Sequence, residues 1–381
     1  MTVNRLRRAQ FTLPFVLLFL LGPALPAHPQ NTSSDSFESL CKRADEARDA
    51  DRLGDAVALY KRALALRPKW AEGWWSLGTI EYDRNHYTAA ARAFRQLLSL
   101  APKNGTARVM LGLCEFELGQ DSAALKHLQQ GKELGVSTNP QLRMVTLYHE
   151  GLLLLRAGQF KAAQTSLMDT CAQQMQAEDV LQALGLAFLR VLPKDAPPAD
   201  SPGNQVVSRV GRAACFTGGK KHEDARREYQ AIVDEYPSYP NIHYAYGRFL
   251  VDVNDTNAGI EQFKLELNNQ PNDVNSRLEI AAAEYKLDSA AGLPFALQAV
   301  TLNPRLPFAH YLLGLLYVDL ANFEKAVPEL EAAQKAFPRD PRLQLALASA
   351  YSRVGRKQDA AKARATYERL SKDSGTETPG Y

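Results

Sequence analysis

Residues Ala71–Pro102 read AEGWWSLGTIEYDRNHYTAAARAFRQLLSLAP and carry the strongest structural signal in the chain. Small and apolar residues recur at helical spacing in two runs, which the turn former Asn85 separates. Gly78 in the first run leaves room for the second run, where Phe94 fills the seam between them. Pro102 ends the stretch because proline lacks the amide donor that would continue a helix. The pattern predicts two antiparallel helices joined by a tight turn.

This pattern returns about every 34 residues along the chain. A small residue recurs at the Gly78 position, at Ala44, Gly112, Ala213, Gly247 and Ala281 and, after a one-residue slip, at Gly314 and Ala348. One helix pair cannot bury its apolar face alone, so neighbouring pairs stack and share a core. We therefore predict an all-α fold, an α-solenoid built from repeated helix-turn-helix units.

The N-terminus has the composition of an export signal. Three arginines precede an apolar run at Phe11–Leu21, and small residues follow at Ala24–Ala27. An uncleaved membrane anchor is the alternative, but the run is short for a span of roughly 20 residues and Pro14 interrupts it. We predict a signal peptide over residues 1–27 and an exported protein, periplasmic or secreted.

The composition of the rest of the chain indicates where one segment ends and the next begins. Four prolines and Gly203 between Pro193 and Gly203 favour a loop or linker between two repeat blocks. A surface loop is favoured over a hinge because connecting segments usually carry no function of their own. We predict a flexible lead-in (28–36), an N-terminal block (37–192), the Pro-rich loop or linker (193–205), a C-terminal block (206–370) and a disordered tail (371–381).

The charge balance argues against nucleic acid as a partner. The chain has 45 Lys and Arg against 42 Asp and Glu, and loss of three arginines with the signal leaves it formally neutral. A nucleic-acid binder normally carries a basic excess or patch. We expect a protein or peptide partner, and a membrane only if the N-terminal segment is not cleaved.

The four cysteines do not form a metal or redox motif. No two of them have C-x-x-C spacing, which excludes the usual zinc and thioredoxin-like patterns. We expect small, buried, unpaired thiols. Cys171–Cys215 is the one pair that an oxidising compartment would make worth considering.

Catalytic motifs are also missing from the sequence. Gly218–Lys221 lacks the glycine spacing and the hydroxyl residue of a phosphate loop, and His149-Glu150 lacks the second histidine of a zinc protease helix. His243 and His310 stand where Trp74 stands in its own unit, which indicates packing. We therefore predict no enzyme activity, no cofactor and no metal.

The first helices of stacked pairs should line a groove. Residues three before, one after and four after the small residue point into it, and several of these are aromatic, a type that favours interfaces. We predict that a partner peptide or helix binds there. The candidate groove residues are Trp75, Tyr82, Phe116, Tyr148, Tyr244, Arg248, Tyr285 and Tyr311.

Trp74, Leu77, Gly78, Ala90, Phe94 and Pro102 fit the spacing W-x2-L-G…A-x3-F…P. From Phe37 to Leu370, the irregular patch excepted, the chain resembles the tetratricopeptide-repeat family. His243–Arg248 and the N-terminus look like exported bacterial members without an assigned activity. Glu81 stands where that family usually has an aromatic residue, a departure that we expect to matter little.

The resemblance implies a right-handed superhelix, here of about nine to ten units, and a role in protein–protein recognition. The carboxylate-clamp subclass has Lys and Asn at inward positions, which this chain does not match. The leading interpretation is a non-enzymatic scaffold or adaptor. The alternative is a membrane-associated accessory factor of an export or polysaccharide-assembly machine.

Overall fold

The computed structural model describes residues 36–136, 139–172 and 177–373. Within these ranges the regular structure is 19 α-helices and one short 3-10 helix, without a strand, which confirms the all-α prediction. In the same ranges no helix combines the length and apolarity that crossing a membrane requires. The predicted signal peptide, residues 28–35 of the lead-in and residues 374–381 of the tail lie outside the described ranges.

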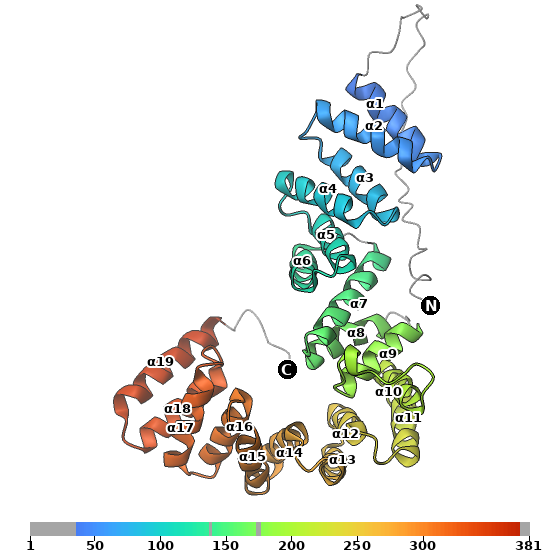
Figure 1. The fold of residues 1–381 in the computed structure, drawn as a ribbon. Helices are drawn as coiled ribbons and strands as arrows, with labels where there is room; N and C mark the ends of the chain where they lie inside the picture. The colour runs from blue at the N-terminus through green and yellow to red at the C-terminus, as the bar shows by residue number, and fades with distance from the viewer. Residues whose placement is uncertain (1–35, 137–138, 173–176, 374–381) are drawn as a thin grey trace, which may run out of the picture. The chain divides into compact units, whose positions relative to one another are not determined.

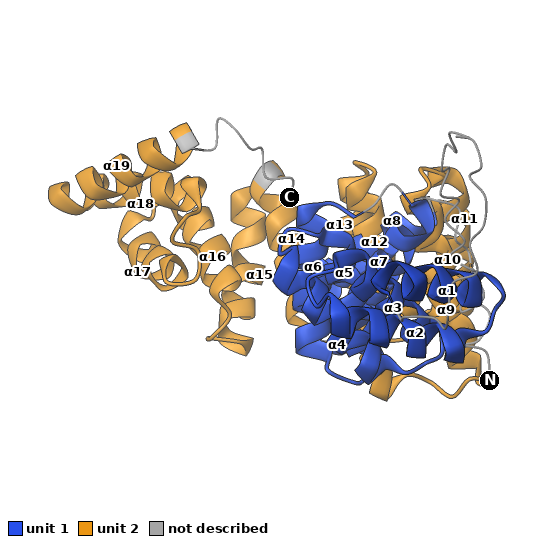
Figure 2. Cartoon of the chain, turned by 90° about the horizontal axis from the view of Figure 1, so that it is seen from above, with its two compact units in different colours: residues 1–173 blue, residues 174–381 orange. Residues whose placement is uncertain are grey.

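The chain divides into two compact units, residues 1–173 and 174–381, which are described separately (Figure 2). The helices are labelled in Figure 1. The first unit contains α1 (Phe37–Asp49), α2 (Leu53–Leu66), α3 (Ala71–Asp83), α4 (Tyr87–Leu100), α5 (Gly105–Glu117), α6 (Asp121–Leu134), α7 (Pro140–Arg156) and α8 (Phe160–Ala172). The second contains α9 (Glu178–Phe188), the 3-10 helix Pro193–Asp195, α10 (Pro202–Gly218), α11 (His222–Glu235), α12 (Ile242–Asp252), α13 (Thr256–Asn269), α14 (Val274–Leu287), α15 (Ser289–Leu302), α16 (Pro307–Asp319), α17 (Phe323–Gln334), α18 (Pro341–Arg353) and α19 (Lys357–Asp373).

Consecutive helices pack as pairs, four in the first unit (α1–α2 to α7–α8) and five in the second (α10–α11 to α18–α19). The small residue on each first helix permits this close packing. A Cβ on Gly78 would lie 2.8 Å from the Phe94 ring, and one on Gly314 would lie 2.5 Å from Leu330. The same relation joins Gly112 to Leu128, Gly151 to Leu167 and Gly247 to Phe263. Phe94, which was predicted to fill the seam, is fully buried, as are Leu128, Leu167, Phe263 and Leu330.

The turns within pairs use left-handed backbone. Positive φ angles occur at the predicted turn former Asn85 and likewise at Gly119, Gly158, Asn254, Gly355, Asp51, Lys220 and Ala321. This conformation lets the chain reverse within three residues after a first helix. The α14–α15 turn differs, because Asp288 has a φ of −150° and its carboxylate accepts a hydrogen bond from the Ala290 amide at 2.9 Å.

The loops between pairs are closed by a side-chain N–H. Trp74 Nε1 donates to the Pro68 carbonyl at 2.8 Å, and His310 Nε2 lies 2.9 Å from the Pro304 carbonyl. The same hydrogen bond joins Arg108 to Pro102, His243 to Pro237, Arg277 to Pro271 and Gln344 to Pro338. The histidines therefore serve packing, as predicted, by holding the terminal proline of the preceding pair.

Helix α9 has no second helix of its own and packs on α10 instead. A Cβ on Gly185 would lie 1.9 Å from the Val207 carbonyl oxygen, and one on Gly211 would lie 1.8 Å from that of Leu181. The Pro-rich segment after α9 thus connects two helices of the same unit. The compact units divide between Gln173 and Gln174, ahead of that segment, and α10 begins at Pro202, four residues before the predicted block.

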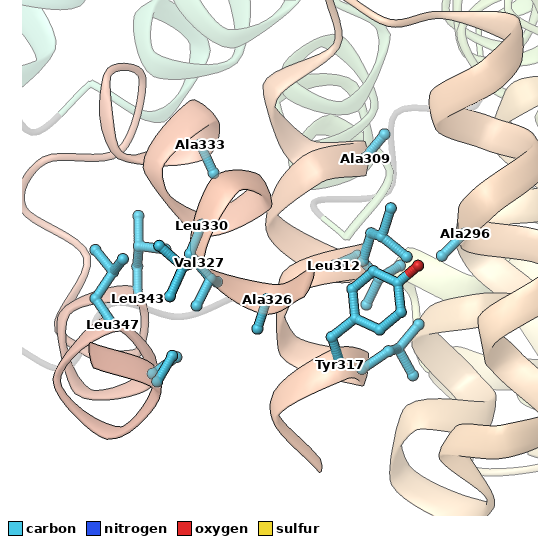
Figure 3. Packing of buried hydrophobic residues seen from close by; sticks show 14 of the residues in the cluster. Ala296, Ala309, Leu312, Tyr317, Ala326, Val327, Leu330, Ala333, Leu343 and Leu347 are labelled. Carbon is cyan, nitrogen blue, oxygen red and sulfur yellow. The ribbon is translucent and has the colours of Figure 1, made fainter. Parts of the chain in front are cut away.

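The core of the second unit continues from one pair to the next. Figure 3 shows Leu312, Leu330 and Leu347, which come from α16, α17 and α18, within one apolar cluster. Small residues of the same cluster, such as Ala309 and Ala326, are fully buried. Each pair covers the apolar face of the next pair, so the buried core of this unit grows with every pair that is added.

Buried carboxylates connect successive pairs in the first unit. Glu81 is 3% exposed and receives hydrogen bonds from Lys61 at 3.1 Å and from His86 at 2.8 Å. Burial by itself would raise the pKa of Glu81, but these two bonds outweigh it and the pKa lies below its usual value. Glu115 repeats the arrangement with Arg95 and His127. Glu81 thus links α2 to α3.

The cysteines fall into two groups. Cys41 and Cys114 are free thiols, whereas Cys171 and Cys215 are disulfide-bonded. Burial raises the pKa of Cys114 to about 12, which keeps that thiol protonated and unreactive. The expectation of unpaired thiols holds for the first group and is wrong for the second.

Candidate partner-binding surface

First helices of successive pairs contact one another, as α5 does with α7, α14 with α16, and α16 with α18. Their side chains three before, one after and four after the small residue, together with Phe308 beside Tyr311, form what we call the first-helix face. All eight residues predicted to bind a partner come from this register. Four lie in the first unit and four in the second.

In the first unit, Trp75 and Tyr82 are half-buried by aromatic neighbours. The Trp75 ring meets Phe94 edge-on with centroids 5.8 Å apart, and Tyr82 meets Tyr87 in the same way at 5.5 Å. Burial raises the pKa of Tyr82, so its phenol stays neutral. Both rings thus pack within the unit and also reach its surface.

Phe116 and Tyr148 meet at His149. The imidazole lies edge-on to Phe116 at 4.6 Å and to Tyr148 at 5.4 Å, and Arg156 stacks over Phe116 at 4.6 Å. Burial lowers the pKa of His149 to about 4, and its Nδ1 lies 2.7 Å from the Val145 carbonyl oxygen. A neutral imidazole therefore lies at the centre of this aromatic cluster, a role that no sequence motif indicates.

In the second unit, Tyr244 and Arg248 lie in a polar cluster. Tyr244 is buried, and its hydroxyl is 3.4 Å from Glu279. Arg248 binds Glu279 at 2.8 Å and Asp252 at 3.4 Å. The Arg190 guanidinium lies over the Tyr244 ring, 5.6 Å from its centroid. The charge of Arg248 is thus largely compensated within the unit.

Tyr285 and Tyr311 belong to a more apolar part of the face. Tyr285 is 37% exposed, and two residues that were not predicted, Phe308 and Leu345, are also exposed. Half-buried Tyr311 lies between Phe308 and Phe337, with ring centroids 6.1 Å and 6.0 Å away. Leu345 precedes Ala348 by three residues, so the register used for the other helices, extended to α18, would have found it.

Stacked helix pairs with a buried small residue at each crossing define a helical-repeat protein. Profiles of the tetratricopeptide repeat match residues 41–88, 77–135, 208–239 and 311–374. Together they cover about half of the chain, and the chain belongs to the tetratricopeptide repeat family. Proteins of this family act in protein–protein interactions.

Individual relatives are distant. The chain is similar to the E3 ubiquitin-protein ligase CHIP of Arabidopsis thaliana, with 26% identity over 113 residues, which is 30% of this chain and 41% of the ligase. It therefore spans less than half of that relative.

Among solved structures, MamA from Desulfovibrio magneticus has 20% identity and a TM-score of 0.39 and covers 45% of this chain and 96% of its own. The Cut9–Hcn1 hetero-tetramer of the APC/C has 11% identity and a TM-score of 0.36, and covers 88% of this chain and 87% of its own.

Proposed function

We propose that the chain is a non-enzymatic scaffold or adaptor that binds a peptide or helix of a partner protein on the first-helix face. One observation carries this proposal. Tyr285, Phe308 and Leu345 are exposed on α14, α16 and α18, first helices that pack against one another in sequence. Large apolar side chains exposed together favour an interface.

Within the second unit, the part of the first-helix face around α16 is better suited to partner binding than the part near α12. Near α12 the cation Arg248 is already paired with Glu279, so an incoming group would have to displace that bond. In α16 the face positions are Tyr311, Leu315 and Val318, with Phe308 exposed beside them, and covering these side chains releases water without breaking an ion pair. An apolar segment of the partner fits this part of the face, with aromatic rings as the main anchors.

We propose that the protein acts outside the reducing cytoplasm. The composition of residues 1–27 and the disulfide-bonded state of Cys171 and Cys215 support export, since disulfides persist in oxidising compartments. The membrane-associated alternative requires an uncleaved N-terminus. Sequencing the N-terminus of the mature protein tests both, because cleavage should leave a start near His28.

Site-specific crosslinking in the native cell tests the binding surface. A photoreactive amino acid replaces Tyr285 in one variant and Phe308 in another. The control replaces Leu100, which is 37% exposed, as Tyr285 is, but ends the second helix α4. We expect the two first-helix positions to capture the same protein and the control to capture none.

The captured protein is then purified for a binding measurement. Replacing Tyr285 and Phe308 together with alanine should weaken binding at least about tenfold, because aromatic anchors dominate interface energies. A loss below about threefold, or equal capture by the Leu100 control, would contradict the proposed surface.

A further inference from the structure

Helix α15 differs from the other second helices of its unit. Its 14 residues, SAAGLPFALQAVTL, include no Asp, Glu, Lys, Arg or His. Leu297 in this helix is 40% exposed and Leu287, just before it, is 58% exposed, while Ala290 and Pro294 are exposed as well. The second helices α11, α13, α17 and α19 all carry charged residues. An uncharged strip therefore faces solvent on α15.

The neighbouring helices are charged at three of the four corresponding places, the exception being Pro328 in α17. Counted from the small residue that faces each first helix, the place of Leu297 is taken by Lys264 in α13 and by Glu331 in α17. Pro294 corresponds to Glu261, which forms an ion pair with Lys264 at 2.8 Å. Rows that contain both signs of charge thus border the strip.

We propose that the α15 strip joins two copies of this chain, with the α15 helices antiparallel across a twofold axis. A charged partner would lose hydration on this strip without finding a counter-ion, so the strip requires another uncharged surface. In a twofold dimer the same patch serves both subunits. The strip on a second copy is such a surface, and Pro294 of one copy packs against Leu297 of the other.

The flanking charges support this arrangement. When α15 is antiparallel to its counterpart, α13 faces α13 and α17 faces α17. Glu261 then lies opposite Lys264 of the second copy, and the reverse contact forms as well. The ends of the outward row of α17 are Glu324 and the C-cap residue Lys335. Both are exposed, and these also exchange. The same twofold axis therefore brings opposite charges together in the α13 row and in the α17 row. Electrostatic complementarity of this kind favours the register.

Sedimentation velocity of the full chain at increasing concentration tests the proposal. We expect dimer to form in the micromolar range, as small interfaces allow. Leu297→Lys should raise the dissociation constant at least about tenfold, because it buries an unpaired charge at the centre of the strip. Leu66→Lys is the matched control: Leu66 is 55% exposed on α2 in the other unit, and self-association should be unchanged.

A charge exchange makes the test specific for a second copy. Lys264→Glu should weaken the dimer because it places carboxylates opposite carboxylates. Glu261→Lys combined with Lys264→Glu should restore it, since both contacts return with reversed signs. A monomer at every concentration, an unchanged dimer in Leu297→Lys, or no recovery in the double variant would overturn the proposal. Crosslinking from the first-helix face is read out on a different protein, so the two proposals can fail separately.

Discussion

One hydrogen bond recurs in this chain with four kinds of side chain. Tryptophan, arginine, histidine and glutamine each donate an N–H to the proline carbonyl six residues earlier. A carbonyl in such a loop is costly to leave without a donor. The position therefore requires a side chain that can place an N–H group next to this carbonyl, and the residue type can vary.

His310 makes the bond at its own position sensitive to pH. Burial alone would lower the pKa of His310, but the Pro304 carbonyl and Glu329 face its two ring nitrogens and the pKa lies above its ordinary value. A group with a raised folded pKa contributes stability that is fully present below its unfolded pKa. That stability is lost as pH rises through the folded pKa.

We therefore predict that His310→Gln removes part of this pH dependence. Glutamine keeps the bond to the loop, as Gln344 does with Pro338 at 3.1 Å, but it does not titrate. Urea midpoints measured between about pH 6 and pH 8 should fall more steeply for the parent protein than for the variant. Equal slopes would show that His310 does not contribute.

Ala321 is strained in its turn. Its φ is +59°, at a position where five other turns have asparagine or glycine, and a Cβ is disfavoured in this region. Ala321→Gly should raise the free energy of unfolding by about 1 kcal/mol. Ala332→Gly, an exposed site within α17, is the control and should lower it by a similar amount. Thermal melts of both variants measure the difference, and a loss at both sites would exclude strain at Ala321.

At the scale of the element, the two helices of each pair can pack closely only where the first helix has no large side chain at the crossing. The first helix carries a small residue, and the second helix carries a large one 16 residues later that fills the space. Interiors are close-packed, so an added methyl group at the crossing displaces a neighbour. Propensity alone would favour alanine over glycine in these helices.

Close packing at the crossing and intrinsic helix propensity can be separated by making a glycine-to-alanine substitution at two sites. Gly247→Ala would place a Cβ 2.6 Å from the Phe263 ring and should destabilise the second unit by about 1–3 kcal/mol. A Cβ on Gly54, in α2, meets nothing within 4 Å, and Gly54→Ala should stabilise by about 0.5 kcal/mol. Denaturant unfolding measures both changes. If both variants gain stability, the crossing is not tightly packed.

At the scale of the whole molecule, the chain is a set of pairs divided into two compact units. Contacts lie mainly within pairs and between consecutive helices, so stability should accumulate pair by pair. The cysteines are spread over both units and report on the oxidation state of the entire chain.

We predict that alkylation of the denatured, unreduced protein labels only two of its four cysteines. Cys41 and Cys114 should react and Cys171 and Cys215 should not, because the latter two are disulfide-bonded. Reduction before labelling is the control and should give four modified residues, read by mass spectrometry. Four labelled cysteines without reduction would contradict the disulfide and weaken the case for export.

The sequence by itself determined the helix pairs, their seams and their turns. Each of these is local: Gly78 with Phe94, or Asn85 in its turn, lies within one repeat, where spacing along the chain translates directly into spacing on a helix. Contacts between distant residues were decided only in the tertiary structure. Glu81 became a buried link to Lys61, Tyr244 was buried beside Glu279, and Phe308 and Leu345 stayed exposed. Burial depends on which neighbours cover a residue, and a repeat pattern does not specify that for each position.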